Sequence, residues 1–178
     1  LWNKFSGAAW KGDGFFYSGY DKPAPGEELT GKNEYQKVFY HKLGDPQDKD
    51  ALVWEDKEHP LRYVGVGTTE DEKWLMLGVS EGTSGSEIFV KDLAKKDALF
   101  TLLFKGFEYD ASPLELVDGR FLVLTNTDAP NFRIVSIDPK NPAKENWQMV
   151  IPEKPEVLSG AGTAGGYLFA NYLKDANS

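Results

Sequence analysis

The stretch that decides the fold is Asp118-Gly119 followed by Phe121-Leu122-Val123-Leu124. A turn dipeptide just before a short apolar run is typical of a chain entering a buried β-strand. The same arrangement occurs 47 residues earlier at Asp71-Glu72 and 47 residues later at Gly165-Gly166. These two turns precede the apolar runs Trp74-Leu75-Met76-Leu77 and Tyr167-Leu168-Phe169-Ala170. The chain therefore repeats one strand-forming unit at a fixed interval.

An earlier copy of this unit begins at Asp13-Gly14, 58 residues before Asp71. The longer interval contains an insertion, Pro23 to Glu28, which we expect to form an exposed loop because it cannot sustain a strand ladder or a helix. A period in the forties with several strands per unit is the mark of β-propeller blades. We therefore predict an all-β fold with about three and a half propeller blades, forming one partial domain over residues 1–178. The expected blades are 1–57, 58–106, 107–155 and an incomplete 156–178.

Composition excludes several classes of protein. An apolar content of 40% and an aromatic content of 13% argue against disorder. The net charge is −8 and no cluster of Lys and Arg stands out, so we expect no nucleic-acid partner. Cysteine is absent, which excludes disulfides and thiolate chemistry. No apolar stretch is long enough for a membrane helix, so we expect no membrane partner.

The motifs of a hydrolytic enzyme are missing from the chain. A serine hydrolase of the α/β type needs a Gly-x-Ser-x-Gly turn, and neither Gly82 to Ser86 nor Ser159 to Gly162 has that spacing. His41 and His59 are the only histidines. We interpret His41 as a surface or packing residue at a strand end and His59 as a solvent-exposed loop residue. We therefore expect no catalytic residue within this chain.

Metal and cofactor sites are not indicated either. The acidic clusters at 70–72 and 45–50 do not follow calcium-loop spacing, and we interpret them as solvated turns. The glycines between Gly160 and Gly166 do not form the Gly-x-Gly-x-x-Gly pattern that precedes a helix in dinucleotide sites. We therefore expect no metal and no cofactor.

Large aromatic residues fall at related places in successive units, at Trp10, Trp74, Phe121 and Tyr167. Packing of one blade on the next requires large side chains, and we expect these four to supply it. The alternative is a stacking platform for a carbohydrate or a peptide.

Five longer strings resemble one family of enzymes. They are Phe5 to Ser18, Tyr35 to Gly44, Leu77 to Thr83, Thr125 to Arg133 and Asp138 to Glu153. Together these strings are spread over nearly the whole chain, and they resemble the prolyl oligopeptidases, also called prolyl endopeptidases.

The resemblance implies a seven-bladed propeller that covers an α/β-hydrolase domain in a cytoplasmic or periplasmic serine peptidase. Such enzymes cleave short peptides after proline. On this resemblance the chain is the middle part of the propeller, is inactive by itself, and filters substrates by size. Its partners would be the α/β-hydrolase domain of the same parent chain and short proline-containing peptides.

Three residues are assigned to the wall of the substrate pocket by the same resemblance. They are Phe5 in Phe-Ser-x-x-Ala-Trp, Val64 in Tyr63-Val64-Gly65, and Thr83 in Ser-Glu-Gly-Thr. The resemblance implies that they contact the third residue of the substrate.

Two alternatives remain open from the sequence. The blades could form a free-standing module that binds proteins or carbohydrates, in keeping with the acidic and aromatic composition. Because a propeller closes only with about four to eight blades, either a longer parent chain supplies the rest or two copies pair as a homodimer. The start at Leu1, without Met, favours a longer parent chain.

Overall fold

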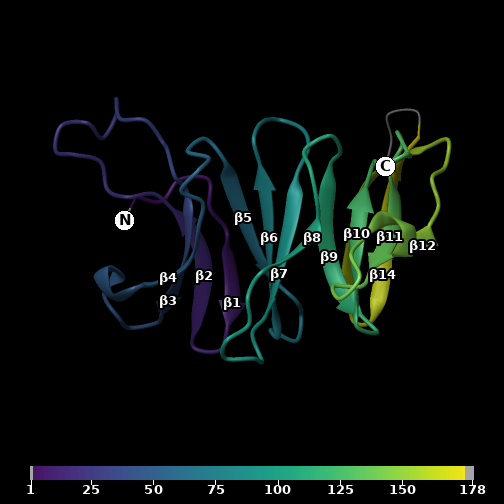
Figure 1. Ribbon diagram of the computed structural model, residues 1–178, viewed down its shortest axis with the longest axis horizontal. Coiled ribbons are helices and arrows are strands. Elements are labelled where there is room, and N and C mark those ends of the chain that lie inside the picture. The colour runs from purple at the N-terminus through teal and green to yellow at the C-terminus, as the bar shows by residue number, and fades with distance from the viewer. Residues whose placement is uncertain (1, 175–178) are drawn as a thin grey trace.

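The computed structural model describes residues 2–174, which form four antiparallel β-sheets that follow one another along the chain (Figure 1). Sheets 1 to 3 have four strands each in sequence order, and sheet 4 has two strands. The helical elements in this described part of the chain are two short 3₁₀ turns, η1 (Gln47–Lys49) and η2 (Lys144–Asn146). Among residues 2–174, no helix is long and apolar enough to cross a lipid bilayer. The prediction of an all-β fold is confirmed.

The strands are short, and each pairs with the next along the chain. Sheet 1 contains β1 (Ala8–Lys11), β2 (Gly14–Gly19), β3 (Lys37–Lys42) and β4 (Ala51–Glu55). Sheet 2 contains β5 (Tyr63–Thr68), β6 (Trp74–Ser80), β7 (Glu87–Asp92) and β8 (Thr101–Phe104). Sheet 3 contains β9 (Ala111–Val117), β10 (Arg120–Thr125), β11 (Arg133–Ile137) and β12 (Gln148–Ile151). Sheet 4 contains β13 (Val157–Ala164) and β14 (Tyr167–Leu173).

The repeated turn is the connection between the first and second strands of each sheet, although in sheet 1 this connection is Gly12-Asp13, one residue earlier than the expected Asp13-Gly14. In sheet 3, Asp118 and Gly119 connect β9 to β10 with φ angles of 49° and 77°. In sheet 4, Gly165 and Gly166 connect β13 to β14 with φ angles of 57° and 80°. Two successive residues with positive φ are typical of a type I′ turn, whose twist matches that of the flanking strands. The repeat in the sequence is therefore the repeat of this hairpin.

The copy of this turn in sheet 2 is wider and is held by a side chain. The Asp71 carboxylate accepts hydrogen bonds from the Thr69 hydroxyl (2.7 Å) and from the Lys73 N–H (3.0 Å). The hydrogen bond from Thr69, followed by those from Lys73, lowers the pKa of Asp71 to about 2. Glu72 adopts a φ of 55° in this turn, a left-handed conformation that non-glycine residues seldom take.

The hydrophobic core lies between adjacent sheets. Successive side chains of a strand point to opposite faces, so the central strand β6 serves two neighbours. Leu75, Leu77 and Val79 pack in a cluster with sheet 1, whereas Trp74 and Met76 pack in a cluster with sheet 3.

Strand β10 repeats this division between two neighbours. Phe121 and Val123 lie in the cluster shared with sheet 2, and Leu122 lies in a cluster with Leu158 of sheet 4. Sheets 2 and 3 are thus each packed between two neighbouring sheets, and the predicted packing of propeller blades is confirmed.

The four aromatic residues expected at the blade contacts divide into two pairs. The rings of Trp74 and Phe121 meet edge to face between sheets 2 and 3, with centroids 5.3 Å apart. Trp10 and Tyr167 are instead 53% and 73% exposed. The expectation is wrong for these two, because within residues 2–174 no further sheet packs on the outer faces of sheets 1 and 4.

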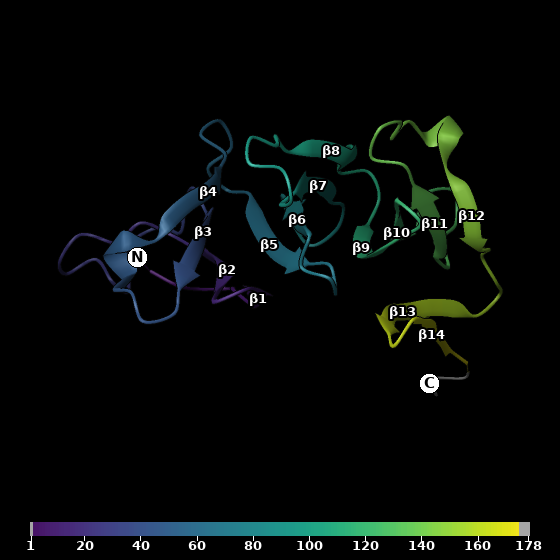
Figure 2. The ribbon, with the colours of Figure 1, turned by 90° about the horizontal axis from the view of Figure 1, so that it is seen from below.

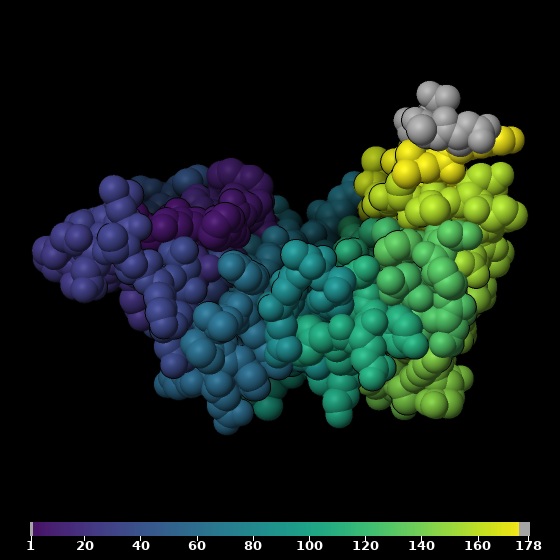
Figure 3. Space-filling view, turned by 90° about the horizontal axis from the view of Figure 1, so that it is seen from above, coloured from purple at the N-terminus to yellow at the C-terminus, as the bar shows by residue number. Residues whose placement is uncertain are grey.

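The sheets stand side by side along an arc that bends at sheet 4 (Figure 2). The space-filling view shows a hollow between sheet 1, in purple, and sheet 4, in yellow (Figure 3). We call the end with the repeated hairpins the turn end, which is lower in Figure 1. The opposite end, with connections 20–36, 56–62, 81–86, 105–110 and 126–132, is the loop end.

Candidate functional site

Phe5 lies at the loop end, just before β1, and its side chain is 72% exposed. Its ring meets the ring of Tyr63 edge to face, with centroids 6.0 Å apart. Phe5 has a φ of 55°, a conformation that costs a non-glycine residue free energy and is enriched at functional sites. The adjacent Ser6 hydroxyl accepts a hydrogen bond from the Ser18 N–H (2.9 Å), which ties this segment to β2. The structure therefore presents an aromatic pair to solvent from a segment that is tied to the sheet.

Val64 is not part of this surface. Its side chain is 1% exposed and packs in the cluster between sheets 1 and 2. Its N–H donates to Gln36 Oε1 (2.8 Å), and its carbonyl accepts from the Ser18 hydroxyl (2.5 Å). The structure thus brings Phe5 against Tyr63, the neighbour of Val64 in the chain.

Thr83 lies in the exposed tip of the loop that joins β6 to β7. The following Gly85 is buried, has a φ of 77°, and donates its N–H to the Asp110 carboxylate (2.6 Å). A Cβ at Gly85 would lie 1.9 Å from the carbonyl oxygen of Phe107, so only glycine fits there. The tip that carries Thr83 is therefore fastened on its carboxyl side.

A network of charges lies on the amino side of the same loop. The Arg62 guanidinium donates to Glu81 and Asp56, and these partners raise the pKa of Arg62 although its partial burial acts in the opposite direction. Burial also acts to raise the pKa of Asp56, but hydrogen bonds from the Glu58 N–H and from His59 outweigh it and hold that pKa below its usual value. Arg62 and Asp56 are therefore both charged at neutral pH.

Neither histidine is placed as a catalytic base. His41 Nδ1 pairs with Asp50 (2.7 Å), and Asp50 also accepts from the Tyr17 hydroxyl (2.5 Å). His59 Nδ1 pairs with Asp56 (2.9 Å) and is partly exposed. Within residues 2–174, no serine hydroxyl pairs with either ring, and no group of three or more acidic or histidine side chains could hold a metal ion.

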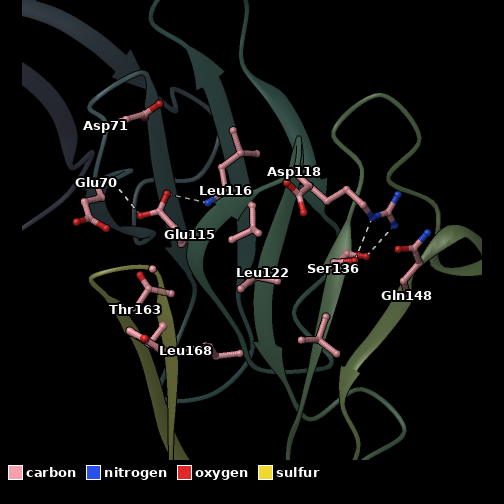
Figure 4. A pocket seen from close by; sticks show the side chains of 15 residues that line it. Glu70, Asp71, Glu115, Leu116, Asp118, Leu122, Ser136, Gln148, Thr163 and Leu168 are labelled. Atoms are coloured by element: carbon pink, nitrogen blue, oxygen red, sulfur yellow. Dashed lines mark hydrogen bonds between the residues drawn. The ribbon is translucent and has the colours of Figure 1, made fainter.

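A groove of about 710 Å³ opens at the turn end, between sheet 3, sheet 4 and the turn before β6 (Figure 4). The Glu115 carboxylate at its edge accepts the N–H groups of Glu70 and Leu116, each at 2.8 Å. The Glu72 carboxylate similarly accepts the Gly12 N–H at 2.8 Å. These glutamates therefore connect the hairpins of neighbouring sheets. The sequence placed the cluster 70–72 in a turn, but nothing local to it indicated these contacts between sheets.

Comparison with known proteins gives a consistent result. The whole chain, residues 1–178, matches the family described as "Prolyl oligopeptidase, N-terminal beta-propeller domain". A prolyl endopeptidase from Elizabethkingia meningoseptica is 41% identical over 174 residues, covering 97% of this chain and 24% of the relative. Prolyl oligopeptidase A from Amanita bisporigera is 33% identical, covering 86% of this chain and 21% of the relative. The chain thus spans about a quarter of the length of the curated relatives it matches.

Solved structures agree with these sequence matches. Prolyl oligopeptidase B from Galerina marginata, bound to a 35-residue hydrolysis and macrocyclization substrate, superposes with a TM-score of 0.86 at 27% identity. That superposition covers 98% of this chain and 25% of the other. A prolyl endopeptidase structure superposes with a TM-score of 0.82 at 30% identity and the same coverage.

Proposed function

This chain belongs to the prolyl oligopeptidase family, within its N-terminal β-propeller domain, and from that premise we propose that it helps to gate a serine peptidase. The peptidase would cleave short peptides after proline. The observation that carries this proposal is the family match over residues 1–178, together with 41% identity to a prolyl endopeptidase.

The proposal has a simple physical basis. Sheets packed face to face form a rigid wall, and a closed ring of such sheets admits an extended peptide but excludes a folded protein. Closure over a catalytic domain also removes bulk solvent from around the reacting groups, which strengthens the electrostatic interactions inside the site. In this role the chain forms part of the wall that encloses the active site, and the catalytic nucleophile belongs to an α/β-hydrolase domain of the same polypeptide.

Several finer points form part of the proposal. The blades would be 1–57, 58–106, 107–155 and 156–178, as part of a seven-bladed ring. The compartment would be the cytoplasm or the periplasm.

We assign the loop end to the substrate pocket. Phe5 and Thr83 would contact the third residue of a bound peptide, in keeping with their exposure at this end. Val64 would contribute to the same wall through the packing that fixes the adjacent Tyr63, because its own side chain is buried.

The test compares the protein encoded by the complete gene with the chain of residues 1–178 alone. We expect the complete protein to hydrolyse a chromogenic Gly-Pro peptide, to lose this activity with a serine-directed inhibitor, and to leave a folded protein substrate intact. The chain alone should give no turnover. Inhibitor-sensitive turnover by the chain alone would contradict the proposal. A complete protein without activity on proline peptides would also contradict it and would favour a free-standing binding module.

A further inference from the structure

Arg62 connects three segments at the loop end. Its Nε and one terminal nitrogen donate to Glu81 Oε1 at 2.8 and 2.6 Å, and the other terminal nitrogen donates to Asp56 Oδ2 at 3.0 Å. Its guanidinium carbon also lies 4.8 Å from the centre of the Phe107 ring. Glu81 begins the loop of Thr83, Asp56 follows β4, and Phe107 lies between β8 and β9.

The loop of Thr83 is therefore held on both sides. Arg62 holds it through Glu81, while the N–H groups of Gly85 and Ser86 donate to Asp110 and Tyr109 in the connection before β9. Between these anchors lie Gly82, Thr83 and Ser84, all exposed. Three residues between two fixed points have few conformations, so the direction in which Thr83 points depends on both anchors.

Only an arginine suits this position. The Arg62 side chain is 17% exposed, and its planar fork bonds two carboxylates while one face lies on an aromatic ring. Lysine is a point charge that cannot form the same set of directed contacts. A lysine here would keep the charge and lose the fixed geometry of the Glu81 contact.

We propose that Arg62 is a positioning residue that holds the Thr83 tip in the orientation needed to receive the third residue of a peptide substrate. This inference rests on the proposed function for its substrate and on the geometry above for its mechanism. Arg62 does not touch the substrate. It acts through Glu81, so its removal lowers selectivity for longer peptides more than it lowers turnover.

The activity test uses the complete protein and two chromogenic substrates, an acetyl-Gly-Pro amide, whose small cap leaves most of the third-residue position empty, and the same amide with one apolar residue inserted between the acetyl cap and glycine. Arg62→Lys and Glu81→Gln should each raise KM for the extended substrate by about fivefold to tenfold and leave kcat nearly unchanged, as expected when uniform binding is lost. KM for the short substrate should stay the same. Arg133→Lys is the matched control, because that side chain is 16% exposed and pairs with Asp128 in another loop.

A second measurement separates this inference from the proposed function. Hydrogen exchange of the Gly85 and Ser86 amides, which donate to Asp110 and Tyr109, should become about tenfold faster in Arg62→Lys and Glu81→Gln but not in Arg133→Lys. If the unmodified protein does not cleave proline peptides, the proposed function fails whatever the exchange rates are. If it does cleave them, an equal rise in KM for both substrates, or unchanged exchange in both variants, overturns the role of Arg62.

Discussion

Replacement of Phe121 by alanine tests whether the contact between sheets 2 and 3 stabilises the chain. The Phe121 side chain is fully buried in a cluster that both sheets share, and its ring meets Trp74 edge to face. Truncation removes this contact and leaves a cavity between two hydrogen-bonded sheets. Neither sheet can move into the cavity without losing its own packing, so we expect little relaxation.

The expected loss of stability follows from these contacts. Burial of a phenylalanine side chain contributes about 1.5–3 kcal/mol, and an edge-to-face aromatic pair adds about 0.5–1.5 kcal/mol. With the cavity included, Phe121→Ala should lower the free energy of unfolding by about 3–5 kcal/mol. At a urea dependence of about 2 kcal/mol per molar, the unfolding midpoint should fall by about 2 M.

Urea unfolding of the chain, followed by tryptophan fluorescence, measures this loss because Trp74 adjoins the substituted ring. Phe169→Ala is the matched control, since Phe169 is 54% exposed on the outer face of sheet 4. We expect the control to change stability by less than about 0.5 kcal/mol. A loss below about 1 kcal/mol in Phe121→Ala would refute the view that packing between sheets is the main source of stability.

Three further predictions concern the loop end. Gly85→Ala should destabilise the chain far more than Gly106→Ala in thermal unfolding, because both glycines have positive φ but only Gly85 lacks space for a Cβ; equal effects would contradict this. Ser18→Ala should cost about 1–3 kcal/mol in urea unfolding, because it leaves a buried carbonyl without its donor, and a neutral result would count against that hydrogen bond. The pKa of Asp56 is lower in the folded chain than its usual 3.8, so its contribution to stability is present above pH 3.8 and is lost as the pH falls through the folded value. As the pH is lowered, the free energy of unfolding should therefore fall less steeply in Asp56→Asn than in the unmodified chain. An equally steep fall in both would contradict the assignment.

The repeated hairpin could be predicted from the sequence because its cause is local. Asp118-Gly119 and Gly165-Gly166 are residue pairs that accept two successive positive φ angles, and each is followed by an apolar strand. Side-chain alternation in β6 and β10 also follows from the two-residue period of a strand. These features needed no knowledge of any distant contact.

The position of the site residues could not be predicted in the same way. Nothing near Val64 in the sequence indicates that its side chain is buried while Tyr63 is exposed, because that depends on the packing of β5 against sheet 1, where Ser18 and Gln36 hydrogen-bond to the Val64 backbone. The exposure of Trp10, which the repeat pattern placed in a contact between sheets, also depends on which sheets are present beside it.

The amino-acid sequence by itself determined the strands, their turns and the two apolar faces of each sheet, because turn chemistry and side-chain alternation act over a few residues. The tertiary structure alone decided which carboxylates connect neighbouring sheets and which arginine holds the loop of Thr83. These contacts join residues that are far apart in the chain, such as Glu115 with Glu70 and Arg62 with Phe107. Such pairs meet only after the sheets have packed, and the packing of whole sheets sets their distances.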